Sequence, residues 1–271
     1  MNSFSIFQRT ERQRVSDGQN MAILDDIKPF HRLLVVLFPQ LGDFDSLEYA
    51  WWIKREADRI QQKQIILRAV GIGDRDSGQR FCEYTGFPPD CLFTDNKGHL
   101  HRQLSLYSGL SLKIPGLSSA QNASLNLLLM CAGIGSPGTL KEVFRGYLGD
   151  KKAPQLINDE EVVKAFPLPS LKGKFFQLAG GSGFQRPFEL ATLRLRNMTE
   201  VLRNWRAYVP DATYLTQRGA TFYYDAQGNL LYEYRDNHLL GFAENMSFPL
   251  AFLDQVSEDI TENLTGSTSS T

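Results

Sequence analysis

Three groups of residues in this 271-residue chain have types and spacing that suggest chemistry. In the first, Pro39, Asp43 and Ser46 stand in a loop between an apolar run and a helical pattern. The second group is made up of the cysteines Cys82, Cys91 and Cys131, and the third is the glycine-rich stretch 179–191, which reads AGGSGFQRPFELA. Each group has a structural interpretation that must be weighed against the functional one.

In the loop, Asp45-Ser46-Leu47-Glu48 is typical of a capping box, with Asp45 as the N-cap and Glu48 three residues later. This predicts Ser46 at the first helical position, where free backbone N–H groups favour an anion. A serine hydroxyl is far less acidic than a thiol, and no histidine lies nearby in the sequence to activate it. Because Asp43 and Asp45 also oppose an anion, we interpret Ser46 as a helix-start residue.

The cysteines form no CxxC pair and are odd in number, which excludes a disulfide framework and a zinc ribbon. Cys82 and Cys91 are either small buried residues or a redox-active site, and both interpretations stay open. Cys131 belongs to an apolar helical pattern and is expected in the core. The four histidines form no ligand set with these cysteines, so we predict neither a metal nor a cofactor.

The glycine-rich stretch 179–191 also has two interpretations. Its glycines, followed by Arg186 and a helix led by Pro187, could hold an anion on free N–H groups. It matches neither the Walker nor the dinucleotide pattern. A loop of small residues that permits a close approach is the interpretation that we favour.

The elements that must position these residues follow from the hydrophobic patterns. The first third of the chain predicts alternating strands and helices, hence parallel strands with crossover helices. The expected strands cover 33–38, 64–73 and 91–95, and the expected helices cover 46–62, 77–87 and 99–106. The last third predicts a hairpin over 220–236, with its turn at 226–229, and a closing helix over 243–256.

Residues 111–216 break this alternation and predict a mostly helical insertion, with helices near 119–132, 139–148 and 187–206. The last of these has an apolar stripe at steps of three and four, formed by Phe188, Ala191, Leu195, Met198, Leu202 and Trp205. The stripe is expected to pack on the sheet. The alternative is a docking face for a protein partner, with Arg194 and Arg203 among the arginines beside it.

Composition limits the function classes. The net charge of −1 gives no basic field for nucleic acid, and no apolar run reaches the length of a membrane-spanning helix. Residues 1–28 lack a secretory signal and are expected to be flexible, residues 29–258 form one domain, and 259–271 form a disordered tail. A cytoplasmic location is expected, or the plastid stroma if the source is a plant or alga.

Several motifs together resemble the peroxiredoxin-like AhpC/TSA family. The spacing Pro39-x-x-x-Asp43-x-x-Ser46 is that of the family's Pro-x-x-x-Thr-x-x-Cys loop. Further resemblances are Phe87-Pro88, Asp95, the segment from Leu100, and Arg218 before Thr221-Phe222-x-x-Asp225-x-x-Gly228. These resemblances cover about residues 30–110 and 215–255. The sequence of the insertion resembles a peroxiredoxin-like branch from photosynthetic bacteria and plastids. The resemblance implies a thioredoxin-like α/β fold with a large, mostly helical insertion.

The departures from the family motif decide which activity is expected. Ser46 stands where the resemblance implies a peroxidatic cysteine, and Asp43 stands where it implies a threonine that binds peroxide. Arg218 lies one residue further from its Phe than is usual. Two hypotheses follow. The chain is a catalytically silent module that binds a partner through its insertion, or it is an antioxidant thiol oxidoreductase that uses Cys82 or Cys91.

Overall fold

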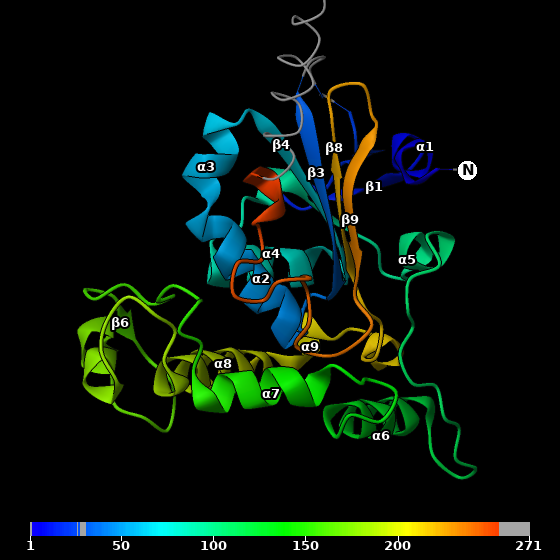
Figure 1. The fold of residues 1–271 in the computed structure, drawn as a ribbon. Coiled ribbons are helices and arrows are strands. Elements are labelled where there is room, and N and C mark those ends of the chain that lie inside the picture. The colour runs from blue at the N-terminus through cyan, green and yellow to red at the C-terminus, as the bar shows by residue number, and fades with distance from the viewer. Residues whose placement is uncertain (1, 26, 28–30, 255–271) are drawn as a thin grey trace, which may run out of the picture.

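The computed structural model describes residues 2–25, 27 and 31–254, and a seven-stranded sheet runs through its centre (Figure 1). The strands lie in the order β2-β1-β5-β4-β3-β8-β9. Their bounds are Glu11–Arg14 for β1, Asn20–Ala22 for β2, Arg32–Gln40 for β3, Ile65–Ile72 for β4, Leu92–Thr94 for β5, Ala220–Tyr224 for β8 and Leu230–Arg235 for β9.

Strand directions identify the fold. β3 pairs in parallel with β4, and β4 pairs in parallel with β5. β8 lies antiparallel to the other edge of β3, and β9 continues the sheet antiparallel to β8. The order β4-β3-β8-β9, with a crossover helix between β3 and β4 and a hairpin at the end, is a thioredoxin-like arrangement. The predicted fold class is therefore confirmed.

Helices cover both faces of the sheet (Figure 1). On one face lie α2, α3 and α4, with bounds Phe44–Arg55, Ala57–Gln62 and Arg75–Thr85; on the other lie α1 and α5, with bounds Ser3–Gln8 and His99–Gln103. β3 is buried on both sides because alternate residues face opposite layers. Leu34, Val36 and Phe38 pack with α2 and α4, whereas Leu33, Val35 and Leu37 pack with α1 and α5.

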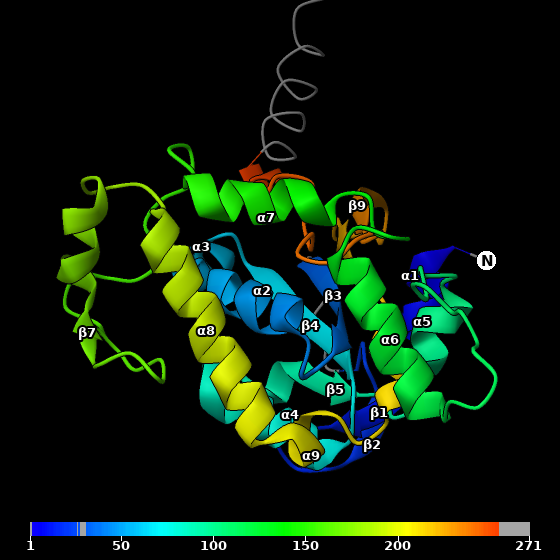
Figure 2. The ribbon, with the colours of Figure 1, turned by 90° about the horizontal axis from the view of Figure 1, so that it is seen from below.

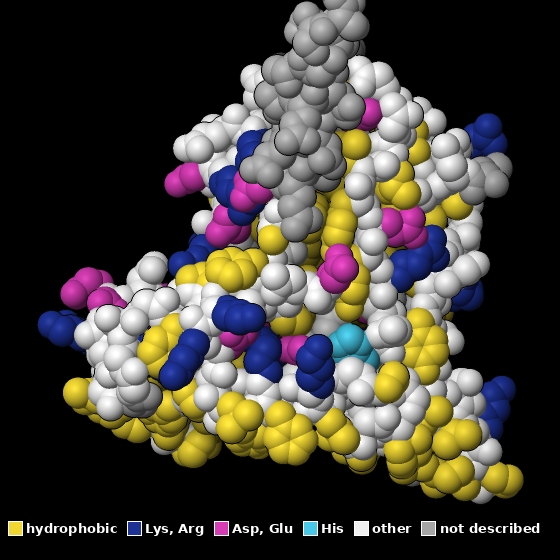
Figure 3. Space-filling view, in the orientation of Figure 1, with side chains coloured by type: hydrophobic (Ala, Val, Ile, Leu, Met, Phe, Trp, Pro, Cys, Tyr) yellow, Lys and Arg dark blue, Asp and Glu magenta, His cyan; other side chains and the backbone are white. Residues whose placement is uncertain are grey.

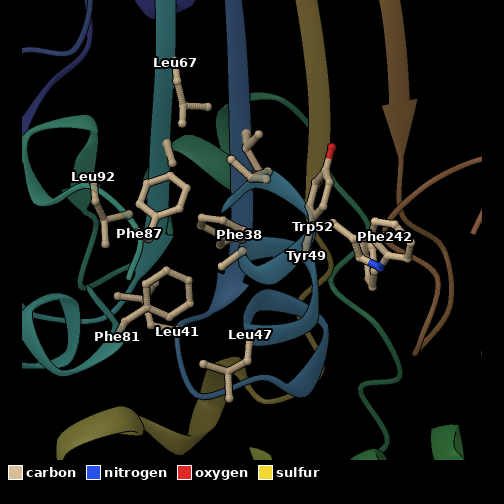
Figure 4. Packing of buried hydrophobic residues seen from close by; sticks show 14 of the residues in the cluster. Phe38, Leu41, Leu47, Tyr49, Trp52, Leu67, Phe81, Phe87, Leu92 and Phe242 are labelled. Atoms are coloured by element: carbon tan, nitrogen blue, oxygen red, sulfur yellow. The ribbon is translucent and has the colours of Figure 1, made fainter. Parts of the chain in front are cut away.

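The core fixes the end of β3, from which the loop of interest leaves. Figure 4 shows Phe38 among the side chains of α2 and α4. The ring centroid of Phe38 lies 5.2 Å from that of Phe81 and 5.6 Å from that of Phe87. Tyr49 of α2 stacks on Phe242 with centroids 4.8 Å apart. Pro39 and the residues after it therefore start from a rigid base.

The predicted helical insertion lies at the end of the sheet where β3 stops (Figures 1 and 2). Its helices are α6 Ser119–Cys131, α7 Thr139–Leu148, α8 Pro187–Arg203 and α9 Trp205–Tyr208. It also holds the two-residue strands β6 (Val162–Val163) and β7 (Leu171–Lys172), which pair with each other. Short 3-10 helices cover Pro89–Cys91, Gly173–Ala179 and Ala212–Tyr214.

Two expectations about the chain ends need correction. Residues 3–22, expected to be flexible, form α1, β1 and β2, because β1 pairs with β5 and Phe7 is fully buried in the core. Of the closing helix expected over 243–256, residues 243–251 form turns and bends, because Asn245 caps a turn and Pro249 follows, whereas residues 252–254 are helical. The expected disordered tail at 259–271 lies outside the described residues.

The orientation of α8 also differs from the expectation. The buried face of this helix is formed by Leu190, Leu193 and Val201, whereas Met198 and Leu202 of the expected stripe are exposed. The helix carries two apolar faces, and periodicity alone does not say which one meets the core. Most of the stripe assigned to the core therefore faces outward, whereas Phe188 at its start packs against Phe176 within the insertion.

Candidate functional site

The helix α2, which follows the loop after β3, begins two residues earlier than predicted. The helix starts at Phe44, and its N-cap is Asp43, whose Oδ1 accepts a hydrogen bond from the N–H of Asp45 at 3.0 Å. The prediction of Asp45 as N-cap is wrong, because Asp43 and Asp45 are both good caps and the sequence does not separate them. Ser46 is consequently the third helical residue.

Ser46 is turned into the protein. Its hydroxyl is fully buried and donates a hydrogen bond to the carbonyl oxygen of Gln40 at 3.0 Å. This bond closes the loop between the end of β3 and the first turn of α2. The hydroxyl therefore has a structural partner within the protein.

Arg218 reaches this loop from the neighbouring strand of the sheet. It lies two residues before the start of β8, the antiparallel neighbour of β3, and its side chain is fully buried. Its Nη1 donates to Oδ2 of Asp45 at 3.0 Å, its Nη2 donates to Oδ2 of Asp43, and its Nε donates to the carbonyl oxygen of Thr216 at 3.2 Å. The structure thus brings the predicted residues Asp43, Ser46 and Arg218 together, with Asp45 added. Pro39 is the second-last residue of β3 and lies beside Asp45 and Ser46.

A third carboxylate, Asp236, lies behind this ion-pair cluster. It follows β9, and its Oδ2 accepts a hydrogen bond from the N–H of Gly219 at 3.1 Å. Burial raises the pKa of Asp236 to about 7, against the opposing effect of Arg218. Sequence reasoning missed Asp236, because only the sheet pairing of β8 with β9 brings residue 236 next to residue 219.

Burial and mutual charge govern the rest of the cluster. Burial, followed by the charge of Asp43, raises the pKa of Asp45 well above its usual range, although Arg218 opposes this. Burial disfavours the charge of Arg218, but Asp43 and Asp45 outweigh it and hold the arginine pKa above its ordinary value. The guanidinium is thus occupied by groups of the protein itself.

The structure brings Cys82 and Cys91 near each other, and neither lines the cavity beside the loop. Burial raises the pKa of Cys82 to about 12, with a further contribution from Cys91. Burial also raises the pKa of Cys91, against the opposing effect of Arg68. Both side chains are therefore neutral thiols at neutral pH, which is the less reactive form.

Cys131 is not in the core, contrary to the prediction. It ends α6, is exposed, and lines a cavity together with Asp43 and Asp45. Partial burial and these two carboxylates raise its pKa. Nothing in the sequence around residue 131 indicates this position, which results from the packing of the insertion against the loop.

That cavity has a volume of about 210 Å³ and lies between the loop and the insertion helices. Its walls are mostly apolar and are formed by Leu127, Val143, Val201, Trp205, Leu215, Leu239 and Leu240, besides the loop residues and Cys131. The insertion approaches the loop closely: a Cβ on Gly42 would lie 2.7 Å from Cβ of Tyr208. Such walls suit an apolar group better than an anion.

The glycine-rich stretch uses its arginine internally. The side chain of Arg186 is fully buried, and its Nη2 lies 3.0 Å from Oε2 of Glu189. Its Nη1 donates to the carbonyl oxygen of Gly181 at 3.0 Å, and Oε1 of Glu189 accepts the N–H groups of Leu156 and Ile157. These contacts favour the close-approach interpretation over an anion cradle.

The two arginines expected on a docking face lie in different surroundings. Nε of Arg194 lies 3.5 Å from Oε2 of the buried Glu48, so this arginine faces α2. Arg203 is exposed and lies over the ring of Phe166, 5.4 Å from its centroid. Only Arg203 of this pair is presented outward.

The described residues contain neither a membrane-spanning helix nor a metal-binding cluster. They contain no helix long and apolar enough to cross a bilayer. Within the same residues, no group of three or more His, Cys, Asp or Glu side chains is arranged to hold a metal ion.

Comparison with known proteins gives one match. The family model described as AhpC/TSA antioxidant enzyme matches residues 52–238, a span that includes Cys82, Cys91, the insertion and Arg218 and begins just after Ser46. No curated protein and no solved structure matches. The matched span exceeds half of the chain and agrees with the thioredoxin-like sheet, so this chain belongs to the AhpC/TSA antioxidant enzyme family.

Proposed function

We propose that this AhpC/TSA family member does not reduce peroxides and acts as a binding module whose insertion carries the binding face. The observation that carries the proposal is the closed ion-pair cluster, in which Asp43 and Asp45 take up the guanidinium of Arg218. In the family motif that this loop resembles, the corresponding arginine would bind a thiolate or the peroxide that it attacks.

The chemistry of the remaining groups supports the proposal. Peroxide reduction needs a thiolate that attacks an O–O bond and becomes a sulfenic acid, and a serine hydroxyl has no such oxidation state. The thiols of Cys82 and Cys91 have raised pKa values because they are buried, which makes them poor nucleophiles.

The test is a peroxide-consumption assay on the full chain with a dithiol reductant, followed by mass spectrometry of the three cysteines. We expect no consumption above that of the buffer and no oxidised thiol. Turnover that is lost in Cys82→Ser or Cys91→Ser would establish the antioxidant alternative and overturn the proposal.

Two gain-of-function variants distinguish the effect of the missing thiol from the effect of the ion-pair cluster. Ser46→Cys alone is expected to stay unreactive, because its new thiol meets two carboxylates and an arginine that is already occupied. Adding Asp43→Thr and Asp45→Asn frees Arg218, so the thiol pKa should fall and its oxidation by peroxide should accelerate by at least about tenfold. Equal rates in the single and triple variants, both folded by circular dichroism, would contradict this account of the cluster.

The proposal that the insertion carries the binding face has a separate test, which uses two charge-reversal variants. Arg203→Glu reverses an exposed charge beside Phe166, whereas Arg194→Glu breaks the ion pair with Glu48. We expect Arg203→Glu to weaken partner binding without a loss of stability and Arg194→Glu to destabilise the fold. Binding that is indifferent to Arg203→Glu would remove this part of the surface from the proposed face.

A further inference from the structure

Exposed apolar side chains are concentrated in the insertion. Of the nineteen large hydrophobic side chains that are exposed in the described part of the chain, sixteen lie between residues 112 and 205. Figure 3 shows hydrophobic side chains gathered along the whole lower edge of the molecule, over the segments that Figure 1 labels α6, α7 and α8. An apolar surface of this extent is unusual on a protein that meets only water.

The clearest element of this surface is α7. Leu140, Phe144, Tyr147 and Leu148 are spaced i, i+4, i+7 and i+8, so they form a single stripe along the helix. Tyr147 is 73% exposed and Leu148 is 81% exposed. The helix is amphipathic with its apolar side turned outward, which is the reverse of a helix that packs on a core.

Neighbouring helices extend the stripe into a face. The insertion face is defined here by nine exposed side chains: Leu128, Ile134, Leu140, Phe144, Tyr147, Leu148, Met198, Leu202 and Trp205. Seen from below, α6, α7 and α8 lie in front of the sheet (Figure 2). The loop before α6 and the β6–β7 region, at opposite ends of the insertion in Figure 1, add exposed Ile114 and Leu178.

The charge of the insertion is opposite in sign to that of the rest of the chain. Residues 111–216 contain 13 Lys and Arg against 8 Asp and Glu, although the whole chain has a net charge of −1. Six of those eight acids take part in ion pairs with arginine or lysine. Nine of the bases are exposed and form no ion pair with any described residue: Lys113, Lys141, Lys151, Lys152, Lys164, Lys172, Lys174, Arg203 and Arg206.

Free bases stand beside members of the insertion face on α7 and at the junction of α8 and α9. Lys141 follows Leu140 at the start of the α7 stripe, and Arg206 lies four residues after Leu202, next to Trp205. An amphipathic surface with leucine and aromatic residues on one side and free Lys or Arg at its margin is typical of elements that lie in a membrane interface. Aromatic residues such as Tyr147 and Trp205 favour the headgroup level.

We propose that the insertion face binds the surface of a lipid bilayer that contains anionic phospholipid. This deepens the proposed function, because it names the partner of the binding module, and it rests on that proposal. The apolar side chains enter the acyl boundary, the free lysines and arginines meet the headgroup phosphates, and the sheet stays in water above the bilayer.

Charge also argues against a second copy of the chain as the occupant. A two-fold symmetric dimer places the same face on both subunits, so two insertions with an excess of free bases would oppose each other. The breadth of the surface, which runs from the loop before α6 to the β6–β7 region, suits an extended planar partner.

The experiment is co-sedimentation of the full chain with vesicles. One set contains phosphatidylcholine alone, and in the other about one third of the lipid is phosphatidylglycerol. We expect binding to the anionic vesicles at least about tenfold tighter than to the neutral ones, with most of the difference lost in about 0.5 M NaCl. Equal binding to both vesicle types, or none to either, overturns the proposal.

Substitutions on α7 test which side chains of the insertion face contact the vesicle. Tyr147→Ser combined with Leu148→Ser should weaken vesicle binding by about tenfold or more, because both side chains lose their transfer into the acyl boundary. The matched control is Leu230→Ser combined with Phe248→Ser, since both residues are 45% exposed and lie outside the insertion. Full binding by the first variant, or equal losses in both, contradicts the assignment of the face.

The outcomes separate the two proposals. Peroxide turnover together with vesicle binding overturns the silent-module proposal and leaves the lipid surface in place. A dimer in sedimentation velocity that Tyr147→Ser combined with Leu148→Ser dissociates identifies a second copy as the occupant and overturns the lipid surface. Retention of circular dichroism and of the thermal midpoint in both double variants excludes unfolding as the cause of lost binding.

Discussion

The ion-pair cluster and the insertion face lie at the same end of the molecule and have opposite character. In the cluster, charged groups are buried and directed at one another, with Asp43, Asp45 and Arg218 as partners. On the insertion face, apolar groups are exposed, and nine exposed lysines and arginines of the insertion form no ion pair with any described residue. In the loop that resembles an active site, the charged groups are already paired with one another within the protein. The insertion, in contrast, exposes apolar and basic side chains that are available to bind a partner.

The largest expected effect comes from opening the cluster. Arg218→Met leaves Asp43, Asp45 and Asp236 without their cation in a buried setting, so we expect a loss of about 3–5 kcal/mol in the free energy of unfolding. Urea denaturation followed by circular dichroism measures it. Arg206→Met, which changes an exposed arginine, is the control and should stay within about 0.5 kcal/mol of the parent. Similar values for the two variants would mean that the cluster contributes little.

The two sides of α8 offer a matched pair. Leu190→Ala removes a side chain that is 2% exposed and should cost about 2–3 kcal/mol, whereas Leu202→Ala removes one that is 59% exposed and should cost less than about 0.5 kcal/mol. Thermal and urea unfolding of both variants test this. If Leu202→Ala were the more costly change, the orientation of α8 and the insertion face would both be wrong.

A pH series tests the burial of Asp236. Because its pKa is about 7 in the folded protein and about 4 when unfolded, the folded state holds an extra proton between these values. Stability therefore falls as pH rises from about 4 to 7 and is flat above that, as far as this group contributes. Asp236→Asn should remove about 4 kcal/mol of this fall, because the two pKa values differ by about 3 units and each unit corresponds to about 1.4 kcal/mol. An unchanged slope in the variant would show that other groups cause it.

The smallest effect on stability is expected on the insertion face. Tyr147→Ser combined with Leu148→Ser should change the free energy of unfolding by less than about 0.5 kcal/mol, because neither side chain is packed in the folded protein. The same change should raise the concentration at which the protein stays monodisperse in light scattering. A large loss of stability would place these side chains in the core and remove them from any binding face.

The fold was largely predictable because its strands and helices are strongly patterned. The run LLVVLF at 33–38 lies inside β3, and the prediction of a helix over 139–148 agrees with α7. Local pattern did not decide between alternatives that differ only in tertiary contacts. The N-cap choice between Asp43 and Asp45 and the choice between the two apolar faces of α8 are of this kind.

The sequence predicted several residues of the candidate site but did not predict how their side chains contact one another. Spacing selected Asp43, Ser46 and Arg218, and the structure brings these three together. The closure of the cluster depends on hydrogen bonds between residues more than 170 positions apart, which no local pattern reports. Asp236 and the exposed position of Cys131 depend on sheet pairing and on the packing of the insertion, so they were missed or misassigned.

The closed cluster also has a consequence for how this sequence can change over generations. Loss of Arg218 leaves the buried Asp43 and Asp45 without their cationic partner. A thiol gained at position 46 alone lies near these carboxylates and finds the guanidinium already paired. Each single step toward the usual family loop is therefore costly or without benefit, so positions 43, 45, 46 and 218 behave as one epistatic unit. We expect relatives with cysteine at the position of Ser46 to lack the acid pair, with few intermediate combinations surviving between the two arrangements.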